Sequence, residues 1–322
     1  MPAIKEIRSI GISSRSRREF LTVEEMIHDH NPSKGTQDIA CVSFEEIVHS
    51  PSSLADLNFF FTIGGDGSVA WLVGAFHKAF EQLPNVPIVP VVRPKSVGFL
   101  KQLDLSPQEE FHKGFSSLLR GNYEVNHRTV LQCPINGRPT VAVNEMVLHS
   151  SPHLAQFTVT LCGNGGRKKG DVVAEILADG LMVVTAMGST AWALSHHGLL
   201  NVNEEALELV FIGATHRAAN YIIPRSDQIH VKVEIKNPVT TKDTVFAYNE
   251  ARENFGLPPD EHSWQTLNLV YGPRVLTDGK VVGFGLTDYI IDPSGSIPFV
   301  SIKRQSVFEK ARKFTRNTEA PF

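Results

Sequence analysis

A glycine-rich loop between two short apolar segments constrains this chain more than any other feature. Residues 58–63 form an apolar run, as a buried parallel strand should, and Gly64-Gly65-Asp66-Gly67-Ser68 follows directly. Apolar residues then recur at helical spacing to Leu83, with Ser68 expected to cap that helix and two prolines to end it. Residues 86–92 predict the next strand. Strand, loop, helix and strand predict a βαβ unit and therefore a parallel sheet.

The character of the sequence changes near residue 121. Short β-branched segments separated by turns then follow, at 128–132, 140–143, 156–161, 175–178, 181–185 and 228–235. The pairs Asn136-Gly137 and Asp179-Gly180 predict hairpins or tight turns. We therefore expect an α/β domain with a parallel sheet over residues 1–120, opened by a strand at 4–12, and an antiparallel all-β domain over residues 121–299. Helical spacing over 303–314 predicts a closing helix.

Composition and charge argue against several classes of partner. The chain has 322 residues, 42% of them hydrophobic, and a net charge of −3, which does not favour nucleic acid or an anionic membrane. It has no apolar segment long enough for a membrane helix, and because its first residues lack the apolar stretch of a signal peptide, we expect none. Its three cysteines form no C-x-x-C pair, and no Cys/His group has the spacing of a metal site. We expect a cytoplasmic protein without a protein-built metal centre.

The glycine loop has the features of a phosphate-binding site. Glycines let the backbone approach an anion closely, and the free N–H groups at a helix start carry partial positive charge. The series Gly65-x-Gly67-x-x-Ala70 also fits the dinucleotide fingerprint, but Asp66 would repel a pyrophosphate there. The acid expected about twenty residues on is missing too, since that strand ends at Arg93. The chain contains no Walker A sequence.

An acid beside phosphates has two chemical uses. Asp66 can accept a proton from an attacking hydroxyl, or it can hold Mg²⁺ against phosphate oxygens. Both uses favour phosphoryl transfer, and a purely structural turn is the alternative. The basic clusters Arg15/Arg17/Arg18 and Arg167/Lys168/Lys169 are either further phosphate ligands or solvated surface.

These residues resemble a known family. Residues 63–68 (IGGDGS) resemble the G-G-D-G-[T/S] motif that NAD kinases share with diacylglycerol and sphingosine kinases. Three further segments are similar to NAD kinase motifs in the expected order, namely 97–100 (VGFL), 143–147 (VNEMV), and 178–183 (ADGLMV) with 188–192 (GSTAW). The resemblance implies an α/β domain plus a β-sandwich-like domain, with residues 300–322 returning to the first. It also implies a homodimer or homotetramer that uses ATP (or polyphosphate), a divalent metal such as Mg²⁺, and NAD to make NADP.

The resemblance assigns roles residue by residue. Asp66 would be the general base that activates the 2′-hydroxyl of the adenosine ribose, and Asn144 and Glu145 would bind adenine and ribose. Asp179 would hold a polar group of the substrate, and Trp192, which replaces a family tyrosine, would stack on a base. The remaining nucleotide-binding residues are expected to be Gly64, Gly65, Gly67, Ser68, Phe99, Thr190, Ala191 and Ser195. For Asp179-Gly180, Trp192 and Ser189-Thr190, the alternatives are a hairpin turn, the core and a helix cap respectively.

The chain departs from the family at three places. The loop Arg93–Val97 is altered, Thr215–Tyr221 lacks the family's P-H-[ST]-L, and Phe246–Glu250 lacks its Asp-Gly pair. Two other functions therefore stay open. One is a related kinase for a lipid or sugar hydroxyl, although such enzymes usually carry an N-E pair close to the loop. The other is a non-catalytic NAD(P)-binding sensor, against which the intact Asp66 speaks.

Overall fold

The chain folds into two compact units that share two long strands. The computed structural model describes residues 7–30, 39–94, 100–150, 154–163, 170–216, 219–235, 274–284 and 288–302. The first unit comprises the described residues up to Arg128 and those from Ser296 onward, and the second comprises Thr129–Gly295. Strands β6 (Glu124–Ile135) and β17 (Asp288–Ser301) run from one unit into the other.

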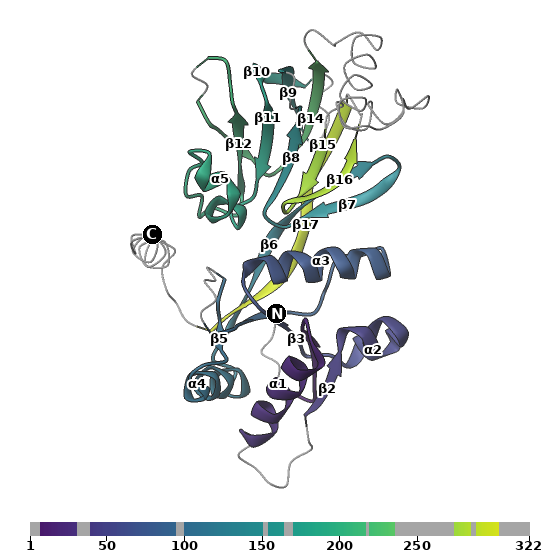
Figure 1. Ribbon diagram of the computed structural model, residues 1–322, viewed down its shortest axis with the longest axis vertical. Helices are drawn as coiled ribbons and strands as arrows, with labels where there is room; N and C mark the ends of the chain where they lie inside the picture. Colours follow the sequence, from purple (N-terminus) through teal and green to yellow (C-terminus); the bar gives the residue numbers. More distant parts are fainter. Residues whose placement is uncertain are drawn as a thin grey trace, which may run out of the picture. The chain divides into compact units, whose positions relative to one another are not determined.

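A parallel sheet forms the centre of the first unit (Figure 1). Its strands β1 (Ser9–Ser13), β2 (Ala40–Ser43), β3 (Phe59–Ile63) and β4 (Ile88–Val92) lie in the order β4-β3-β1-β2. The short β5 (Leu103–Asp104) and the end of β17 pair with β4. Every residue of β1, β3 and β4 is buried, which is why β3 and β4 are mostly apolar instead of alternating between apolar and polar residues.

Helices cover both faces of this sheet. Helices α1 (Arg17–Asp29) and α4 (Gln108–Leu119) share one core with Phe59 and Phe61. On the other face the ring of Phe60 packs edge-on against Phe44 of α2 (Phe44–His49) and Phe76 of α3 (Asp66–Phe80). A 3₁₀ turn, η1 (Pro51–Asp56), leads from α2 into β3. The predicted βαβ unit is therefore confirmed as β3, α3 and β4.

Both ends of α3 differ from the prediction. The N-cap is Gly65 and not Ser68, because the Ser68 N–H already donates to the Gly65 carbonyl at 2.9 Å within the first turn. The helix ends at Phe80, where Glu81 turns into the left-handed region at φ 54°, so the chain leaves the helix before the prolines. The first strand begins at Ser9, among the described residues, and ends at Ser13 instead of residue 12.

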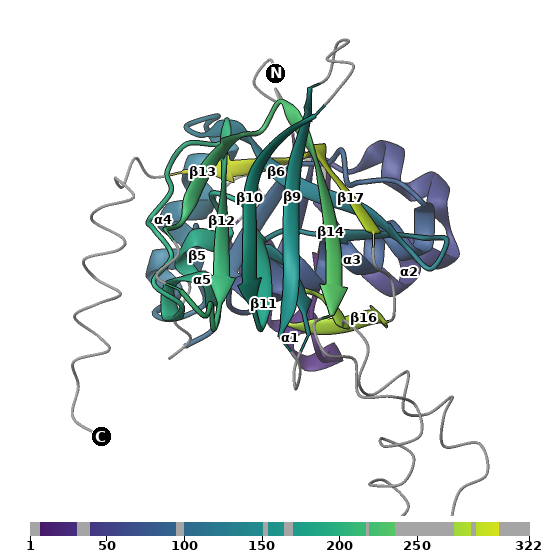
Figure 2. The same ribbon diagram turned by 90° about the horizontal axis from the view of Figure 1, so that it is seen from above.

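The second unit is an antiparallel sandwich, as expected. One sheet pairs β10 (Asp171–Ala178), β9 (Ala155–Gly163), β14 (Asp227–Ile235) and β17, and Figure 2 shows β10, β9 and β14 side by side. The other sheet has the order β13-β12-β11-β8-β15-β16. Its strands are β13 (Tyr221–Pro224), β12 (Ala206–Ile212), β11 (Gly180–Val184), β8 (Glu145–His149), β15 (Arg274–Thr277) and β16 (Lys280–Phe284). Apolar residues of both sheets, such as Phe157 and Leu148, meet in one core.

Two Asx-Gly pairs in this unit behave differently. Asn136 and Gly137 adopt φ 51° and 74° and join β6 to β7 (Arg138–Ala142) in the predicted hairpin. Asp179-Gly180 is not a hairpin turn, because β10 pairs with β9 in one sheet while β11 pairs with β8 and β12 in the other. Asp179 thus carries the chain from one sheet of the sandwich to the other. The closing helix expected at 303–314 lies outside the described residues.

None of the helices in these described ranges has the length and apolarity needed to cross a membrane.

Candidate active site

The glycine loop begins where β3 leaves the parallel sheet. The Gly64 N–H donates to the Val91 carbonyl of β4 at 2.8 Å, and Gly64 has φ 147°. A Cβ at this position would lie 1.9 Å from the Ser68 Oγ, so only glycine fits against that side chain. Gly65 then caps α3 in an extended conformation. The loop therefore turns the chain sharply into the N-terminus of α3, where unpaired N–H groups favour an anion.

Asp66 is the first residue of α3 and is half-buried. Its Oδ1 accepts a hydrogen bond from the Leu100 N–H at 3.0 Å. Gly67 beside it is exposed, and nothing lies within 4 Å of a Cβ built there. Asp66 is therefore partly exposed, and one of its carboxylate oxygens is bound to a backbone N–H. Phe99, which precedes Leu100, is outside the described residues.

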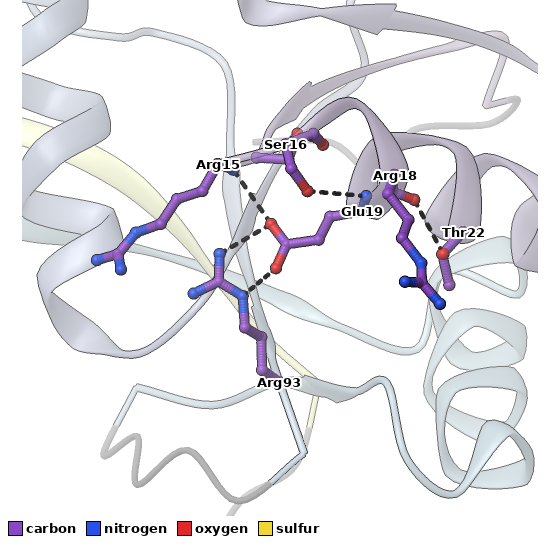
Figure 3. A network of polar contacts seen from close by, with 7 residues as sticks. Arg15, Ser16, Arg18, Glu19, Thr22 and Arg93 are labelled. Atoms are coloured by element: carbon purple, nitrogen blue, oxygen red, sulfur yellow. Dashed lines mark hydrogen bonds and ion pairs between the residues drawn. The ribbon is translucent and has the colours of Figure 1, made fainter.

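An ion pair lies beside this loop. The Arg93 guanidinium donates from Nε and Nη2 to the two carboxylate oxygens of Glu19, the second bond at 2.8 Å (Figure 3). Glu19 also accepts the Arg15 N–H at 3.2 Å, and its own N–H is capped by the Ser16 Oγ. In the sequence, Arg93 counted against a dinucleotide fold and began the altered loop at 93–97, and Glu19 carried no signal.

In the second unit, the backbone of Asn144 is held from two sides. Asn144 precedes β8, and its N–H donates to the Asp278 Oδ1 at 2.7 Å. Its carbonyl accepts from the N–H and the Oγ1 of Thr185, at 2.9 and 3.1 Å. No described residue hydrogen-bonds its side-chain amide, so this amide can pair with the edge of a base.

The turn after β11 packs directly on Asn144. Gly188 opens a 3₁₀ turn, η2 (Gly188–Thr190), and its N–H donates to the Thr185 Oγ1 at 3.0 Å. A Cβ on Gly188 would lie 2.0 Å from the Asn144 carbonyl oxygen and 2.8 Å from its Cα. The added Cβ would clash with backbone atoms of Asn144, and backbone atoms cannot move aside as a flexible side chain can. Glycine at 188 is what allows Asn144 and the η2 turn to lie together.

Glu145 is buried beside Asn144. Its side chain is 3% exposed, and its Oε2 has no hydrogen-bond partner among the described residues. Burial raises the pKa of Glu145 to about 7, and the nearby Asp278 carboxylate adds to the rise. Burial also raises the pKa of Asp278, although three backbone N–H groups oppose that effect. A buried acceptor with an unused oxygen suits a ligand hydroxyl.

The short helix α5 (Trp192–Ser195) continues from this turn across one face of the sheet. Ala193 packs on Val147 and Met182, which anchors the helix there. Trp192 is 36% exposed, with its ring 5.7 Å from that of His196, so it is not a core residue. Its exposed face is available for stacking.

The hydroxyl groups around α5 do not cap it. Ala191 occupies the N-cap of α5 without a side-chain bond. Ser189 and Thr190 donate instead to carbonyls, Thr190 to Met187 at 3.3 Å. Ser195 donates to the Trp192 carbonyl at 2.7 Å. Their oxygens keep free lone pairs that can accept from a ligand.

Asp179 lies at the other end of the same strands. The register pairs Glu145 with Val184 and His149 with Gly180, and Asp179 lies opposite Ser150, so Asn144 and Asp179 are six residues apart along β8, roughly 20 Å. The Asp179 carboxylate instead lies against Gly213, which has φ 59° and where a Cβ would be 2.2 Å from Oδ2. The structure therefore brings Asn144, Glu145 and Thr190 to one end of β8 and leaves Asp179 at the opposite end.

Sequence reasoning gave no role to three residues of this second-unit site, Thr185, Gly188 and Asp278, although Gly188 begins one of the motifs. An Asp-Gly pair was sought at 246–250, which lies outside the described residues. Residues 275–279 read Val-Leu-Thr-Asp-Gly, and their turn, with Asp278 at φ 47°, contacts Asn144. The left-handed Asp-Gly turn was the signal that could have found it.

Comparisons with known proteins found relatives of this chain. The chain is 27% identical over 252 residues to the NAD kinase of Pyrococcus abyssi, covering 73% of this chain and 82% of that protein. It is 30% identical over 225 residues to the NAD kinase of Psychrobacter arcticus, covering 63% and 64%. The chain is thus similar in sequence, at a low level of identity, to members of the NAD kinase family. No family model matches it.

Two solved structures share its fold. An NAD kinase from Archaeoglobus fulgidus in complex with ATP superposes with a TM-score of 0.62 at 18% identity, covering 96% of this chain and 98% of that chain. Yeast NADH kinase complexed with NADH gives a TM-score of 0.65 at 19% identity, covering 98% and 89%. The sandwich and the parallel sheet thus recur in proteins of this family.

Proposed function

We propose that the chain is an NAD kinase, which transfers the terminal phosphoryl group of ATP (or polyphosphate) to the 2′-hydroxyl of the adenosine ribose of NAD and so makes NADP. The observation that carries the proposal is Asp66, a half-buried carboxylate at the start of α3 inside a glycine loop. The ATP and NADH in the two related structures support the substrate classes.

The reaction requires a general base and a binding site for the phosphate groups. The ribose oxygen attacks the terminal phosphorus, the bond from that phosphorus to the bridging oxygen breaks, and the hydroxyl proton goes to the carboxylate of Asp66. The leaving diphosphate keeps the electrons of the broken bond. The hydrogen bond from Leu100 holds one carboxylate oxygen in place, so the carboxylate has a defined orientation. Free N–H groups at the start of α3 bind phosphate oxygens.

Nucleoside recognition falls to the second unit. The Asn144 amide reads the adenine edge, and Glu145 accepts hydrogen bonds from ribose hydroxyls. The hydroxyls of Thr190 and Ser195 and the backbone of Ala191 contribute polar contacts, and Trp192 stacks on a base. Asp179 contacts a different part of the dinucleotide from Asn144, since the two lie at opposite ends of β8.

A magnesium ion fits this site as a partner of the donor. The described residues contain no group of three or more His, Cys, Asp or Glu side chains that could hold a metal, and the described loop offers one carboxylate, Asp66. Mg²⁺ bound to a nucleotide needs few protein ligands, because water and phosphate oxygens fill most positions. When bound, the ion would neutralise phosphate charge.

The decisive experiment measures NADP formation from ATP, Mg²⁺ and NAD. Asp66→Asn should lower kcat about 10²–10⁴-fold, the usual contribution of a general base, while NAD affinity stays within about twofold. Asp56→Asn is the matched control, because Asp56 is exposed in η1. Near-normal turnover by Asp66→Asn would disprove the base role, and a wild-type protein inactive with both donors would disprove the function.

The family resemblance also leads us to propose a homodimer or homotetramer, and the cysteine content and N-terminal sequence lead us to propose that it is cytoplasmic. Light scattering on the purified full-length chain measures the subunit number, and a monomer at micromolar concentration would contradict it.

A further inference from the structure

The Arg93–Glu19 ion pair crosses the end of the strand that carries the glycine loop. In the sheet order β4-β3-β1, strand β3 lies between the other two, and the parallel strands end at the same edge. Glu19 belongs to α1, which follows β1, and Arg93 follows β4 directly. The two side chains therefore meet over the exit of β3, where Gly64 begins the loop.

The contacts fix the direction of the guanidinium. Glu19 is held by the Arg15 N–H and lies in the first turn of α1, so its carboxylate is a rigid acceptor (Figure 3). It accepts from Nε and Nη2 of Arg93, which orients the planar fork. The third nitrogen, Nη1, has no described hydrogen-bond partner and lies 3.7 Å from a Cβ built on Gly64. One charged donor therefore faces the glycine loop.

The partial exposure of the Arg93–Glu19 pair indicates that the pair does more than stabilise the fold. The side chains are 23% and 25% exposed, so water reaches both, and ion pairs with that much exposure contribute little to stability. An arginine held on two nitrogens is instead well placed to donate from the third to a phosphate oxygen. The ion pair already restricts its side chain, so binding a phosphate costs little further side-chain entropy. A lysine could not hold the carboxylate on two nitrogens and present a third donor.

We propose that Arg93 binds the phosphate chain of the phosphoryl donor and that Glu19 positions it, an inference that rests on the proposed kinase function. The ligand class is a linear triphosphate, as in ATP or polyphosphate. Because the contact is made at the glycine loop of the first unit, Arg93 serves the donor and not the nicotinamide nucleotide. Arg93 is thus a determinant of donor affinity, and Glu19 acts only through it.

Steady-state kinetics of the full-length chain tests this assignment. Arg93→Ala should raise the KM for ATP at least about tenfold, the usual effect of losing a charge-assisted hydrogen bond, with the KM for NAD unchanged within twofold. Arg93→Lys should recover little, and Glu19→Gln should raise the KM for ATP to a smaller extent. Arg138→Ala is the matched control, because Arg138 is an exposed arginine on β7 with no role in the proposed site.

Binding of inorganic triphosphate, measured by calorimetry without any turnover, separates this proposal from the kinase function. Loss of triphosphate binding in Arg93→Ala, with an unchanged melting temperature, supports the assignment even in a protein that makes no NADP. Equal triphosphate affinity in wild type and Arg93→Ala, or no binding by wild type, overturns it. A parallel rise of both KM values with a lowered melting temperature also overturns it, since that is the signature of a purely structural pair.

Discussion

Replacing Glu145 by glutamine should make the protein more stable at alkaline pH and flatten its stability profile. Glu145 is 3% exposed, and its pKa rises from an ordinary 4.5 to about 7 because burial penalises the charged form. Between these two values the folded protein binds the proton more tightly than the unfolded chain. The stability from this group is therefore fully present below about pH 4.5 and is lost as the pH rises through about 7.

The size of the effect follows from the same pair of values. At about 1.4 kcal/mol per pH unit, the interval from 4.5 to about 7 corresponds to roughly 3 kcal/mol. Glutamine has nearly the same shape and cannot ionise, so Glu145→Gln should keep most of this free energy at pH 8.5. The Asp278 carboxylate strengthens the effect, because its negative charge disfavours a second one beside it.

Urea unfolding at pH 5 and pH 8.5, followed by circular dichroism, measures the difference. The free energy of unfolding should fall less between the two pH values in Glu145→Gln than in wild type, with the slope against urea unchanged. Glu175→Gln on β10 is the matched control, because Glu175 is exposed. The same pH dependence in Glu145→Gln and wild type would refute the reasoning, as would a larger fall in the variant.

Two further substitutions test the second-unit site. Gly188→Ala places a Cβ 2.0 Å from the Asn144 carbonyl oxygen, so we expect a loss of about 1–3 kcal/mol in the free energy of unfolding and weaker NAD binding. Gly74→Ala, which meets nothing within 4 Å inside α3, should instead stabilise by about 0.4–1 kcal/mol, and equal behaviour of the two variants would contradict the packing argument. Trp192→Ala should weaken NAD binding in calorimetry by about 1–3 kcal/mol with little change in melting temperature, since the ring is 36% exposed, and unchanged affinity would rule out stacking.

Local chemistry predicted those elements whose signals are themselves local. The apolar run Phe59–Ile63 and the glycines after it identified β3 and its loop. Both signals depend only on neighbouring residues, since apolar side chains indicate a buried strand and glycines indicate a backbone that can turn sharply. Asn136-Gly137 predicted its hairpin for the same reason. Asp179-Gly180 carries the same turn chemistry, yet its two strands belong to different sheets. A dipeptide shows that the chain bends, and only distant strand pairing decides where it goes.

The site shows the same division. A contiguous stretch was enough to predict a glycine loop with Asp66 between β3 and a following helix, although the cap of that helix is Gly65 and not Ser68. Asp278 acts on Val143 from 135 residues away in the sequence, and Arg93 meets Glu19 across 74 residues. Neither partnership leaves a pattern in the sequence alone. Gly188 is of the same kind, because its need for glycine comes from the Asn144 backbone and not from a turn of its own.

The three segments that meet at Asn144 give a physical reason for placing recognition there. Reading a base edge requires an amide held within a fraction of an ångström, and a side chain at the end of a strand has that precision only when its backbone is fixed. Asp278 binds the Asn144 N–H, Thr185 binds its carbonyl, and Gly188 packs against both. Every backbone group of Asn144 is thereby used, while its side-chain amide remains unbonded to any described residue. Burying two carboxylates, Glu145 and Asp278, at the same point costs folding energy. Stability alone would not favour such a pair, and the proposed ligand role of Glu145 would offset that cost if a ligand bonds its Oε2, which has no partner among the described residues.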